Sequence, residues 1–205
     1  MGAIVEKKIL SELQNIINEN KYMKGKATDA NTIGIPEYVI YFSESGVEHI
    51  KNRHQDKYAP GSLFNEGLNY IDVARKISAT PSTREEGPYG AKVKWIGVDT
   101  KADVGYMGVA HADLENVANM KDYVMPDSKN MEKVKVSGGE RKSTKKASLI
   151  TVVVGKLSDG REALSVISMF PGGADIDGKI IPSDRSKFAA EGFYFVLPAD
   201  SPALS

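Results

Sequence analysis

The sequence contains no cysteine, and this absence excludes three kinds of chemistry. Without thiols the chain can form no disulfide, hold no cysteine-based zinc site and use no thiolate nucleophile. A surplus of charge of one sign is also missing, because 27 Lys and Arg residues balance 27 Asp and Glu residues. Net charge therefore does not indicate a nucleic-acid or membrane partner, and any such partner has to be bound by a local patch.

Long apolar runs are absent too, so no segment of the sequence is expected to span a bilayer as a helix. Residues 1–8 carry charges within a helical pattern, which is not typical of a signal peptide. The rest is ordinary for a globular protein of 205 residues, with 41% hydrophobic and 26% charged side chains. These features predict a cytoplasmic protein without a membrane partner, although the lack of cysteine also fits a secreted protein without disulfides. They do not predict its oligomeric state.

Hydrophobic periodicity predicts helices early in the chain and antiparallel strands later, which is the α+β pattern. Apolar residues recur at helical spacing within residues 4–20 and residues 63–79. A strand is predicted over residues 38–42, followed by a helix opened by Ser45, because Ser45 and Glu48 have the spacing of a capping box. Further strands are predicted over residues 92–98, 105–109, 133–136, 149–154, 164–170 and 193–197, with Asp159-Gly160 as the hairpin turn between the fourth and the fifth.

Two of the 3 histidines lie in one short stretch, residues 45–54, together with an arginine and a lysine. A helix here places His49 and Arg53, four residues apart, on one face. His54 falls on the apolar face and diverges from His49 by about 140° on an ideal helix. The two imidazoles can converge on one substrate only if the helix ends near Arg53 or a second element closes over the gap. The turn-forming residues 54–61 favour an early end.

These side chains match the needs of metal-free RNA cleavage. One base removes the proton of the ribose 2′-OH, one acid protonates the leaving 5′ oxygen, and a cation stabilises the charge on the phosphorane. His49 and His54 can supply base and acid, and Arg53 or Lys51 can supply the cation. The alternative is that His54 is a core histidine and Arg53 pairs with a surface acid. The enzyme interpretation gains support if the two imidazoles lie within reach of one phosphate, and it fails if His54 is buried and hydrogen-bonded to the backbone.

A second group of residues can bind the substrate. A basic cluster on the predicted loop over residues 137–146 can bind phosphates, although a charge run on a loop is more often a solvated tip. The cluster consists of Arg141, Lys142, Lys145 and Lys146. Tyr58 can stack on a base, with a place in the core as the alternative.

No metal and no cofactor is expected from the residue patterns. His49 and His54 are five residues apart and do not have the His-x-x-x-His spacing of a zinc helix. His111 and Asp113 could add ligands, but nothing in the sequence places them near the other two. The glycine pairs of the chain lack the strand-loop-helix context of a phosphate-binding loop.

The pattern His49-Ile50-x-x-Arg53-His54, together with the predicted helix over residues 63–79 and the late strand ending Ser168-Met169-Phe170-Pro171, resembles phage-associated nuclease-like domains. These domains belong to the superfamily named after barnase, EndoU, colicin nucleases and RelE, and the resemblance covers about residues 38–175. It implies N-terminal helices packed on an antiparallel sheet. It also implies a metal-independent endoribonuclease, a toxin or phage effector that acts in the host-cell cytoplasm on RNA and has a cognate immunity protein.

The same resemblance implies roles for four residues. His49 and His54 correspond to the acid/base pair and Arg53 to the phosphate clamp, while Ser168 donates a hydrogen bond to the scissile phosphate. Residues 21–35 are polar and contain glycine, which predicts a loop between the first helix and the main body. The predicted organisation is therefore a helical arm over residues 1–35 and a nuclease-like domain over residues 36–205, with an insertion near residues 99–147.

Two departures from the family pattern leave other functions open. The neutral net charge is unlike that of many ribonucleases, and the family pattern does not place an insertion near residues 99–147. One alternative is a non-catalytic phage or mobile-element protein that binds and inhibits a host defence protein. Another is a protein that binds a nucleotide ligand through the same histidines.

Overall fold

The structure, a computed structural model, describes residues 4–21, 23–56, 59–77, 82–86, 92–125, 133–182 and 185–204. The chain forms two compact units, each assembled from three separate segments. Unit 1 consists of Met1–Ile50, Asn69–Thr100 and Ala147–Met169, and unit 2 of Lys51–Leu68, Lys101–Lys146 and Phe170–Ser205. Residues 1–35, which the sequence predicts as a separate arm, therefore share unit 1 with residues 36–50. Most of the expected insertion near residues 99–147 falls in unit 2.

Unit 1 contains a six-stranded sheet in the order β1-β2-β12-β11-β5-β4. The strands are β1 (Thr32–Gly34), β2 (Tyr38–Tyr41), β4 (Ser82–Glu86), β5 (Lys92–Asp99), β11 (Lys146–Lys156) and β12 (Glu162–Pro171), the last two reaching one and two residues into unit 2. The predicted strand over residues 38–42 and the hairpin around Asp159-Gly160 are confirmed, since Gly160 takes the positive φ of 92° that its turn needs.

The sheet of unit 1 is mixed, which corrects the prediction of an antiparallel sheet. β1 pairs with β2 in antiparallel orientation, but β2 pairs with β12 in parallel, with Ile40 opposite Leu164. A parallel pair needs a crossover connection, and between β2 and β12 the chain passes through more than a hundred residues of other elements. The fold class is thus mixed α and β, with antiparallel pairs in the majority of the pairings described.

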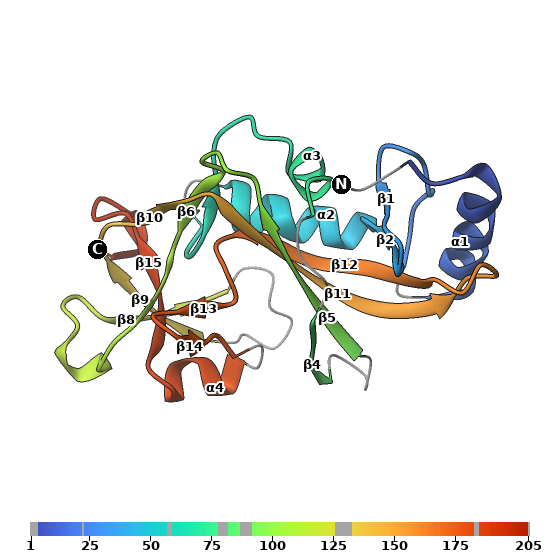
Figure 1. The fold of residues 1–205 in the computed structure, drawn as a ribbon. Coiled ribbons are helices and arrows are strands. Elements are labelled where there is room, and N and C mark those ends of the chain that lie inside the picture. Colours follow the sequence, from blue (N-terminus) through green and yellow to red (C-terminus); the bar gives the residue numbers. More distant parts are fainter. Residues whose placement is uncertain are drawn as a thin grey trace. The chain divides into compact units, whose positions relative to one another are not determined.

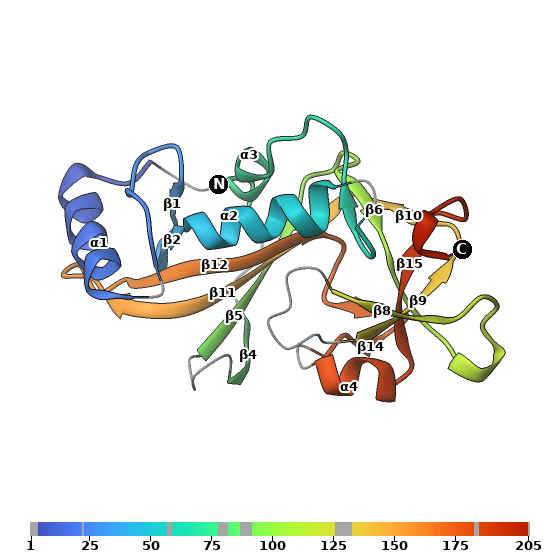
Figure 2. The ribbon, with the colours of Figure 1, turned by 180° about the vertical axis from the view of Figure 1, so that it is seen from behind.

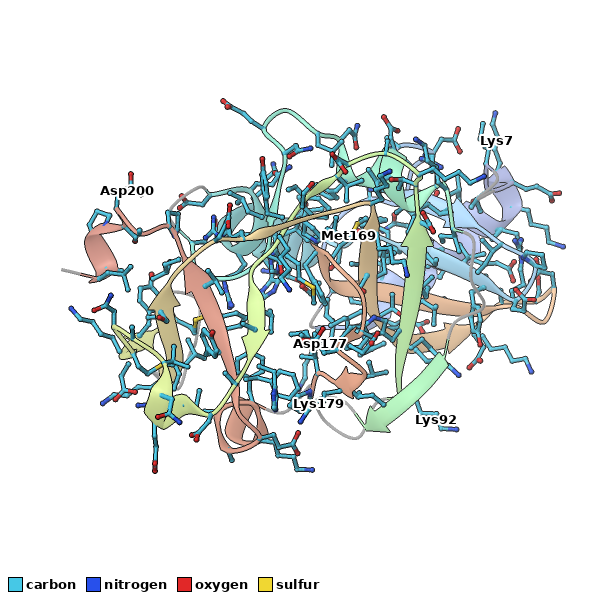
Figure 3. The ribbon with its side chains drawn as sticks, turned by 60° about the vertical axis from the view of Figure 1, so that its left-hand side comes forward. Lys7, Lys92, Met169, Asp177, Lys179 and Asp200 are labelled. Atoms are coloured by element: carbon cyan, nitrogen blue, oxygen red, sulfur yellow. The ribbon has the colours of Figure 1, made fainter. Side chains whose placement is uncertain are left out.

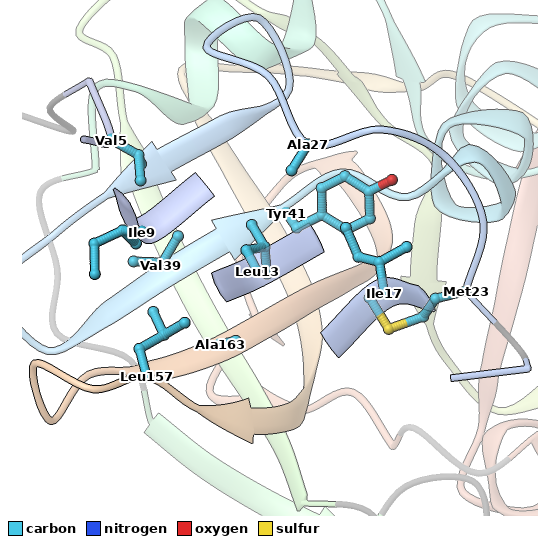
Figure 4. Close-up of a cluster of buried hydrophobic side chains, with 10 residues drawn as sticks. All are labelled: Val5, Ile9, Leu13, Ile17, Met23, Ala27, Val39, Tyr41, Leu157 and Ala163. Carbon is cyan, nitrogen blue, oxygen red and sulfur yellow. The ribbon is translucent and has the colours of Figure 1, made fainter. Parts of the chain in front are cut away.

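Helix α1 (Lys7–Glu19) confirms the first predicted helix, and it packs through one face on the sheet of unit 1. Its buried residues Ile9, Leu13 and Ile17 are spaced four apart, so they form one apolar stripe. The stripe contacts side chains from β2 and from the hairpin of β11 and β12 (Figure 4). The whole cluster consists of Val5, Ile9, Leu13, Ile17, Met23, Ala27, Val39, Tyr41, Leu157 and Ala163. Full burial of a large apolar side chain stabilises a fold by about 1.5–3 kcal/mol, so this cluster anchors the N-terminal segment.

Helix α2 (Glu44–Ile50) begins two residues earlier than Ser45 predicts. The backbone N–H of Gly46 donates to the Ser43 hydroxyl at 3.1 Å, so Ser43 and not Ser45 caps the helix. Gly46 also lets α2 lie close to β12, since a Cβ there would stand 2.2 Å from the Val166 carbonyl oxygen. Helix α2 runs beside β12 in both Figure 1 and Figure 2, which view the structure from opposite sides.

The helix predicted over residues 63–79 is much shorter in the structure. Its first residues form strand β3 (Leu63–Phe64), and helix α3 covers only Tyr70–Ala74. Gly67, with φ of 76°, interrupts the pattern, and Asn69 starts the helix by accepting hydrogen bonds from the N–H groups of Ile71 and Asp72. Residues 78 and 79 lie outside the described part of the chain.

Unit 2 holds three smaller sheets, in the orders β10-β6-β3, β7-β15-β9-β8 and β13-β14. Their strands are β6 (Gly105–Met107), β7 (Val109–His111), β8 (Lys121–Val124), β9 (Lys133–Gly138), β10 (Lys142–Thr144), β13 (Asp175–Ile176), β14 (Lys179–Ile180) and β15 (Phe193–Leu197). Figure 3 marks Asp177 in the turn between β13 and β14 and Lys179 on β14. Strand β15 matches its predicted range and pairs parallel to β9 and antiparallel to β7. It forms the core of unit 2 with helix α4 (Arg185–Ala190), whose Phe188 ring lies 4.8 Å from Phe195.

The helices described in either unit include none with the length and apolar character needed to cross a membrane.

Candidate functional site

The stretch with the two histidines contains a wide helical turn that the sequence does not predict. Helix α2 ends at Ile50, and a π-helical turn, η1 (Lys51–Gln55), follows it directly. The turn is closed by a hydrogen bond from the Asp56 N–H to the Lys51 carbonyl at 3.1 Å. Single π-helical turns are rare and are often found at functional sites.

The π-helical turn buries Arg53 and His54 in unit 2, while its neighbours stay exposed. Arg53 is 5% exposed and His54 is 8% exposed, whereas Lys51 and Gln55 face solvent. The Arg53 guanidinium carbon lies 5.9 Å from the centre of the Phe195 ring, within the range of a cation–π contact. The His54 ring lies 5.7 Å from Phe170 at an angle of 39°.

One hydrogen bond determines which nitrogen of the His54 ring carries the proton. Nδ1 lies 2.8 Å from the backbone carbonyl oxygen of Ser62. A carbonyl oxygen only accepts hydrogen bonds, so Nδ1 has to be the protonated nitrogen. In the neutral ring Nε2 then carries the lone pair.

The segment Ala59–Ser62 that accepts this bond is itself held by close backbone contacts. The Ser62 hydroxyl accepts a hydrogen bond from the N–H of Gly108 at 3.0 Å. A Cβ at Gly108 would stand 1.9 Å from the Gly61 carbonyl oxygen, so only glycine permits this approach. The predicted strand over residues 105–109 is interrupted at this glycine, which separates β6 from β7.

Arg141 holds the same segment from its other end. Its Nη2 donates to the Ala59 carbonyl at 2.9 Å, and its Nε donates to the Val196 carbonyl at 3.3 Å. Burial lowers the pKa of this guanidinium, because a charge is less favourable away from water. The sequence analysis assigns Arg141 to substrate phosphates, whereas the structure shows its donors directed at two backbone carbonyls of unit 2.

The other three members of the basic cluster are exposed. Lys142 lies on β10, Lys145 follows that strand, and Lys146 begins β11. The predicted loop over residues 137–146 is therefore partly a strand, since β10 pairs with β6 with Lys142 opposite Met107. Three exposed ammonium groups within five residues form a surface of the kind that binds phosphates.

The residues predicted as catalytic are divided between the two units. His49 is half-buried near the end of α2, and Ser168 is 8% exposed on β12, both in unit 1. Arg53 and His54 belong to unit 2, where the structure brings them together with Phe170 and Phe195. Lys51 is exposed on η1, and Tyr58 lies outside the described residues.

The surroundings of His54 meet the condition that counts against an acid/base role. The ring is buried and is hydrogen-bonded to the backbone, as a core histidine would be. The same bond is also the usual way in which a protein selects one imidazole tautomer for proton transfer. The geometry therefore supports a fixed Nδ1–H form of His54 under either interpretation.

Sequence reasoning missed Ser62, Gly108 and the position of Arg141. Ser62 holds His54 through a backbone carbonyl, which every residue type provides, so no residue pattern marks it. The glycine at 108 is the one signal that could have indicated a close backbone approach.

Among the described residues, no group of three or more His, Asp or Glu side chains is placed to hold a metal ion. His111 is engaged within unit 2, with Nε2 at 2.8 Å from the Glu191 carbonyl and its ring edge-on to Phe193. Comparisons of the chain with protein-family models, with curated proteins and with solved structures find no match.

Proposed function

We propose that the chain is a metal-independent endoribonuclease that cleaves RNA by transesterification, on a fold of the barnase, EndoU, colicin nuclease and RelE type. The observation that carries the proposal is the π-helical turn with adjacent Arg53 and His54, in which Ser62 fixes the His54 tautomer. An imidazole with one fixed tautomer and a neighbouring guanidinium are the groups that proton transfer beside a phosphate requires.

The proposed reaction balances without a metal or cofactor. A base takes the proton of the ribose 2′-OH, and the 2′ oxygen forms a bond to phosphorus. The bond from phosphorus to the 5′ oxygen breaks, and an acid protonates that oxygen, which leaves a 2′,3′-cyclic phosphate and a 5′-OH. Within unit 2 we assign His54 as one of the proton-transfer groups and Arg53 as the cation for the phosphorane.

Substitutions at the histidines test this assignment. His54→Gln keeps a polar side chain but cannot exchange a proton near neutral pH. His49→Ala removes the imidazole that the sequence pattern assigns as the second proton-transfer group. We expect each variant to lose about 10²–10⁴-fold in the rate of RNA cleavage, as is typical for one acid/base group. EDTA should leave the wild-type rate unchanged, and the products should end in 2′,3′-cyclic phosphate.

His111→Gln is the matched control, because His111 bonds to a backbone carbonyl elsewhere in unit 2 and has no proposed role in the reaction. It should cleave RNA at the wild-type rate. Full activity of His54→Gln would remove His54 from the chemistry, and wild-type protein that leaves RNA intact would overturn the proposal as a whole.

The burial of His54 favours a second candidate, a non-catalytic protein that binds a protein partner such as a host defence protein. In that case Arg53 and His54 serve the packing of unit 2, and the neutral net charge agrees with a protein partner better than with RNA. A stoichiometric complex with a host protein that His54→Gln also forms, in the absence of RNA cleavage, would support this candidate.

A further inference from the structure

Arg141 is the one member of the basic cluster whose charged group is directed into unit 2, and its contacts lead toward His54. Its two donors end on the carbonyls of Ala59 and Val196. Ala59 opens the four-residue segment whose last member, Ser62, accepts the hydrogen bond of His54 Nδ1. Lys142, its neighbour in sequence, is exposed.

The segment Ala59–Ser62 is held at both ends and in the middle. Arg141 holds its first residue, and the Gly108 N–H holds the Ser62 side chain. The Gly61 N–H points to the Val196 carbonyl at 3.4 Å, the same carbonyl that Arg141 Nε contacts. The N–H of Val196 in turn donates to the Gly108 carbonyl at 2.8 Å, so strand β15 and Gly108 brace the segment as one group.

We propose that Arg141 is a positioning residue for His54: it fixes the segment Ala59–Ser62, and thereby the Ser62 carbonyl that selects the Nδ1–H tautomer. The inference rests on the proposed function only for its effect on RNA cleavage, because the effect on the His54 tautomer is independent of activity. A guanidinium suits this task because its planar set of donors can serve two carbonyls at once, which a single ammonium group does less well.

The inference predicts a different phenotype from phosphate binding by Arg141. A residue that grips RNA raises KM when it is removed and lowers the dependence of binding on salt. A residue that positions His54 lowers kcat and leaves KM nearly unchanged, because the group that it affects acts in the transition state. In addition, loosening the Ser62 carbonyl lets the neutral His54 ring populate the Nε2–H tautomer.

The test uses Arg141→Lys and Arg141→Met in the full chain, with Glu140→Ala as a control at the exposed neighbouring residue. The ¹⁵N chemical shifts of the imidazole nitrogens, assigned by comparison with His54→Gln, distinguish the two tautomers. We expect signals of the Nε2–H form in both Arg141 variants and only the Nδ1–H form in the wild type and in Glu140→Ala. In the cleavage assay we expect kcat to fall about 10- to 100-fold with little change in KM, less than the loss of an acid/base group itself.

Ser62→Ala gives a second route if Arg141→Met does not fold, because it keeps the Ser62 carbonyl and removes only the bond from Gly108. It should also introduce the Nε2–H form. Folded Arg141 variants with an unchanged His54 spectrum would overturn the inference, as would a rise in KM with unchanged kcat. Wild-type protein without RNA cleavage would overturn the proposed function alone, since the spectra would still decide whether Arg141 positions His54.

Discussion

At the scale of single residues, backbone carbonyls organise the candidate site. His54 and Arg141 each direct a donor at a main-chain oxygen of unit 2. A buried polar group left without a hydrogen bond costs about 1–3 kcal/mol, so such pairings stabilise the conformation that makes them. The conformation of Ala59–Ser62 and the positions of the His54 and Arg141 side chains therefore stabilise each other.

The contact between Gly61 and Gly108 yields a prediction about stability. In Gly108→Ala the new Cβ would overlap the Gly61 carbonyl oxygen at 1.9 Å, and neither backbone can move without breaking the hydrogen bond to Ser62. We expect the free energy of unfolding to fall by about 1–3 kcal/mol, as for other overpacked sites. Urea denaturation followed by circular dichroism measures this change.

Gly173→Ala is the matched control in the same unit. The nearest atom to a Cβ at Gly173 is a side-chain oxygen of Asp175 at 3.8 Å. Gly173 and Gly108 both lack a positive φ, so the two substitutions differ only in the space around the new Cβ. Its free energy of unfolding should stay within about 0.5 kcal/mol of the wild type. Equal effects of the two substitutions would show that the approach of Gly108 to Gly61 has no special importance.

The sequence pattern singles out Arg53 and His54, and the structure shows both side chains buried in unit 2, whereas their roles in catalysis stay predictions. Burial, however, depends on elements distant in sequence, such as the Phe170 and Phe195 rings that contact this pair. The sequence analysis grouped Arg141 with its lysine neighbours because its hydrogen bonds to the Ala59 and Val196 carbonyls exist only in the folded chain.

At the scale of elements, the sequence predicted helices and strands correctly where the hydrophobic periodicity was strong. It failed where turn-forming or capping residues interrupt a helical pattern. α1 follows from its apolar stripe, and the hairpin of β11 and β12 follows from alternation around Asp159-Gly160. The helix predicted over residues 63–79 failed because Gly67 and Asn69 favour a turn and a new N-cap in its middle. The choice of Ser43 over Ser45 as the cap depends on the approach of Gly46 to β12, which no local pattern reveals.

Tyr41 on strand β2 leads us to expect a loss of stability at alkaline pH. Burial, and then the nearby charge of Glu44, raise the pKa of Tyr41 in the folded chain, and its hydroxyl donates to the Lys24 carbonyl at 2.9 Å. The unfolded chain releases the phenol proton more readily, so the stabilisation is fully present below about pH 10 and declines as the pH rises above that value. We expect the free energy of unfolding to fall as the pH rises above about 10, and to fall less in Tyr41→Phe.

Tyr106→Phe, at an exposed position, controls for the loss of a phenol as such. It should show the same alkaline decline as the wild type. Some decline should persist in Tyr41→Phe, because burial also raises the pKa of Tyr70. Parallel curves for Tyr41→Phe and the wild type would exclude Tyr41 as a source of the effect.

At the scale of the whole chain, the features that the sequence could not predict are those that join distant segments. The parallel pairs of β2 with β12 and of β9 with β15 depend on connections of many residues, whereas the hairpin depends on a local turn. Each unit is likewise drawn from three separate segments of the chain. The predicted boundary between residues 35 and 36 used local composition, which carries no information about such long-range assembly.

The charge of the whole chain leads to a last prediction, about RNA binding. With zero net charge, the chain can bind RNA only through a local patch, and Lys142, Lys145 and Lys146 are the exposed part of the basic cluster. Replacing these three by alanine should weaken RNA binding and make the slope of log K against log salt less steep by about 2, because each contact to a single strand contributes about 0.7. Fluorescence anisotropy with labelled RNA at several salt concentrations measures both quantities.

The control replaces three exposed lysines of unit 1, Lys7, Lys8 and Lys26, which changes the net charge equally. An equal loss of affinity in both triple variants would show that RNA responds to the net charge of the chain and that the basic cluster is a solvated surface.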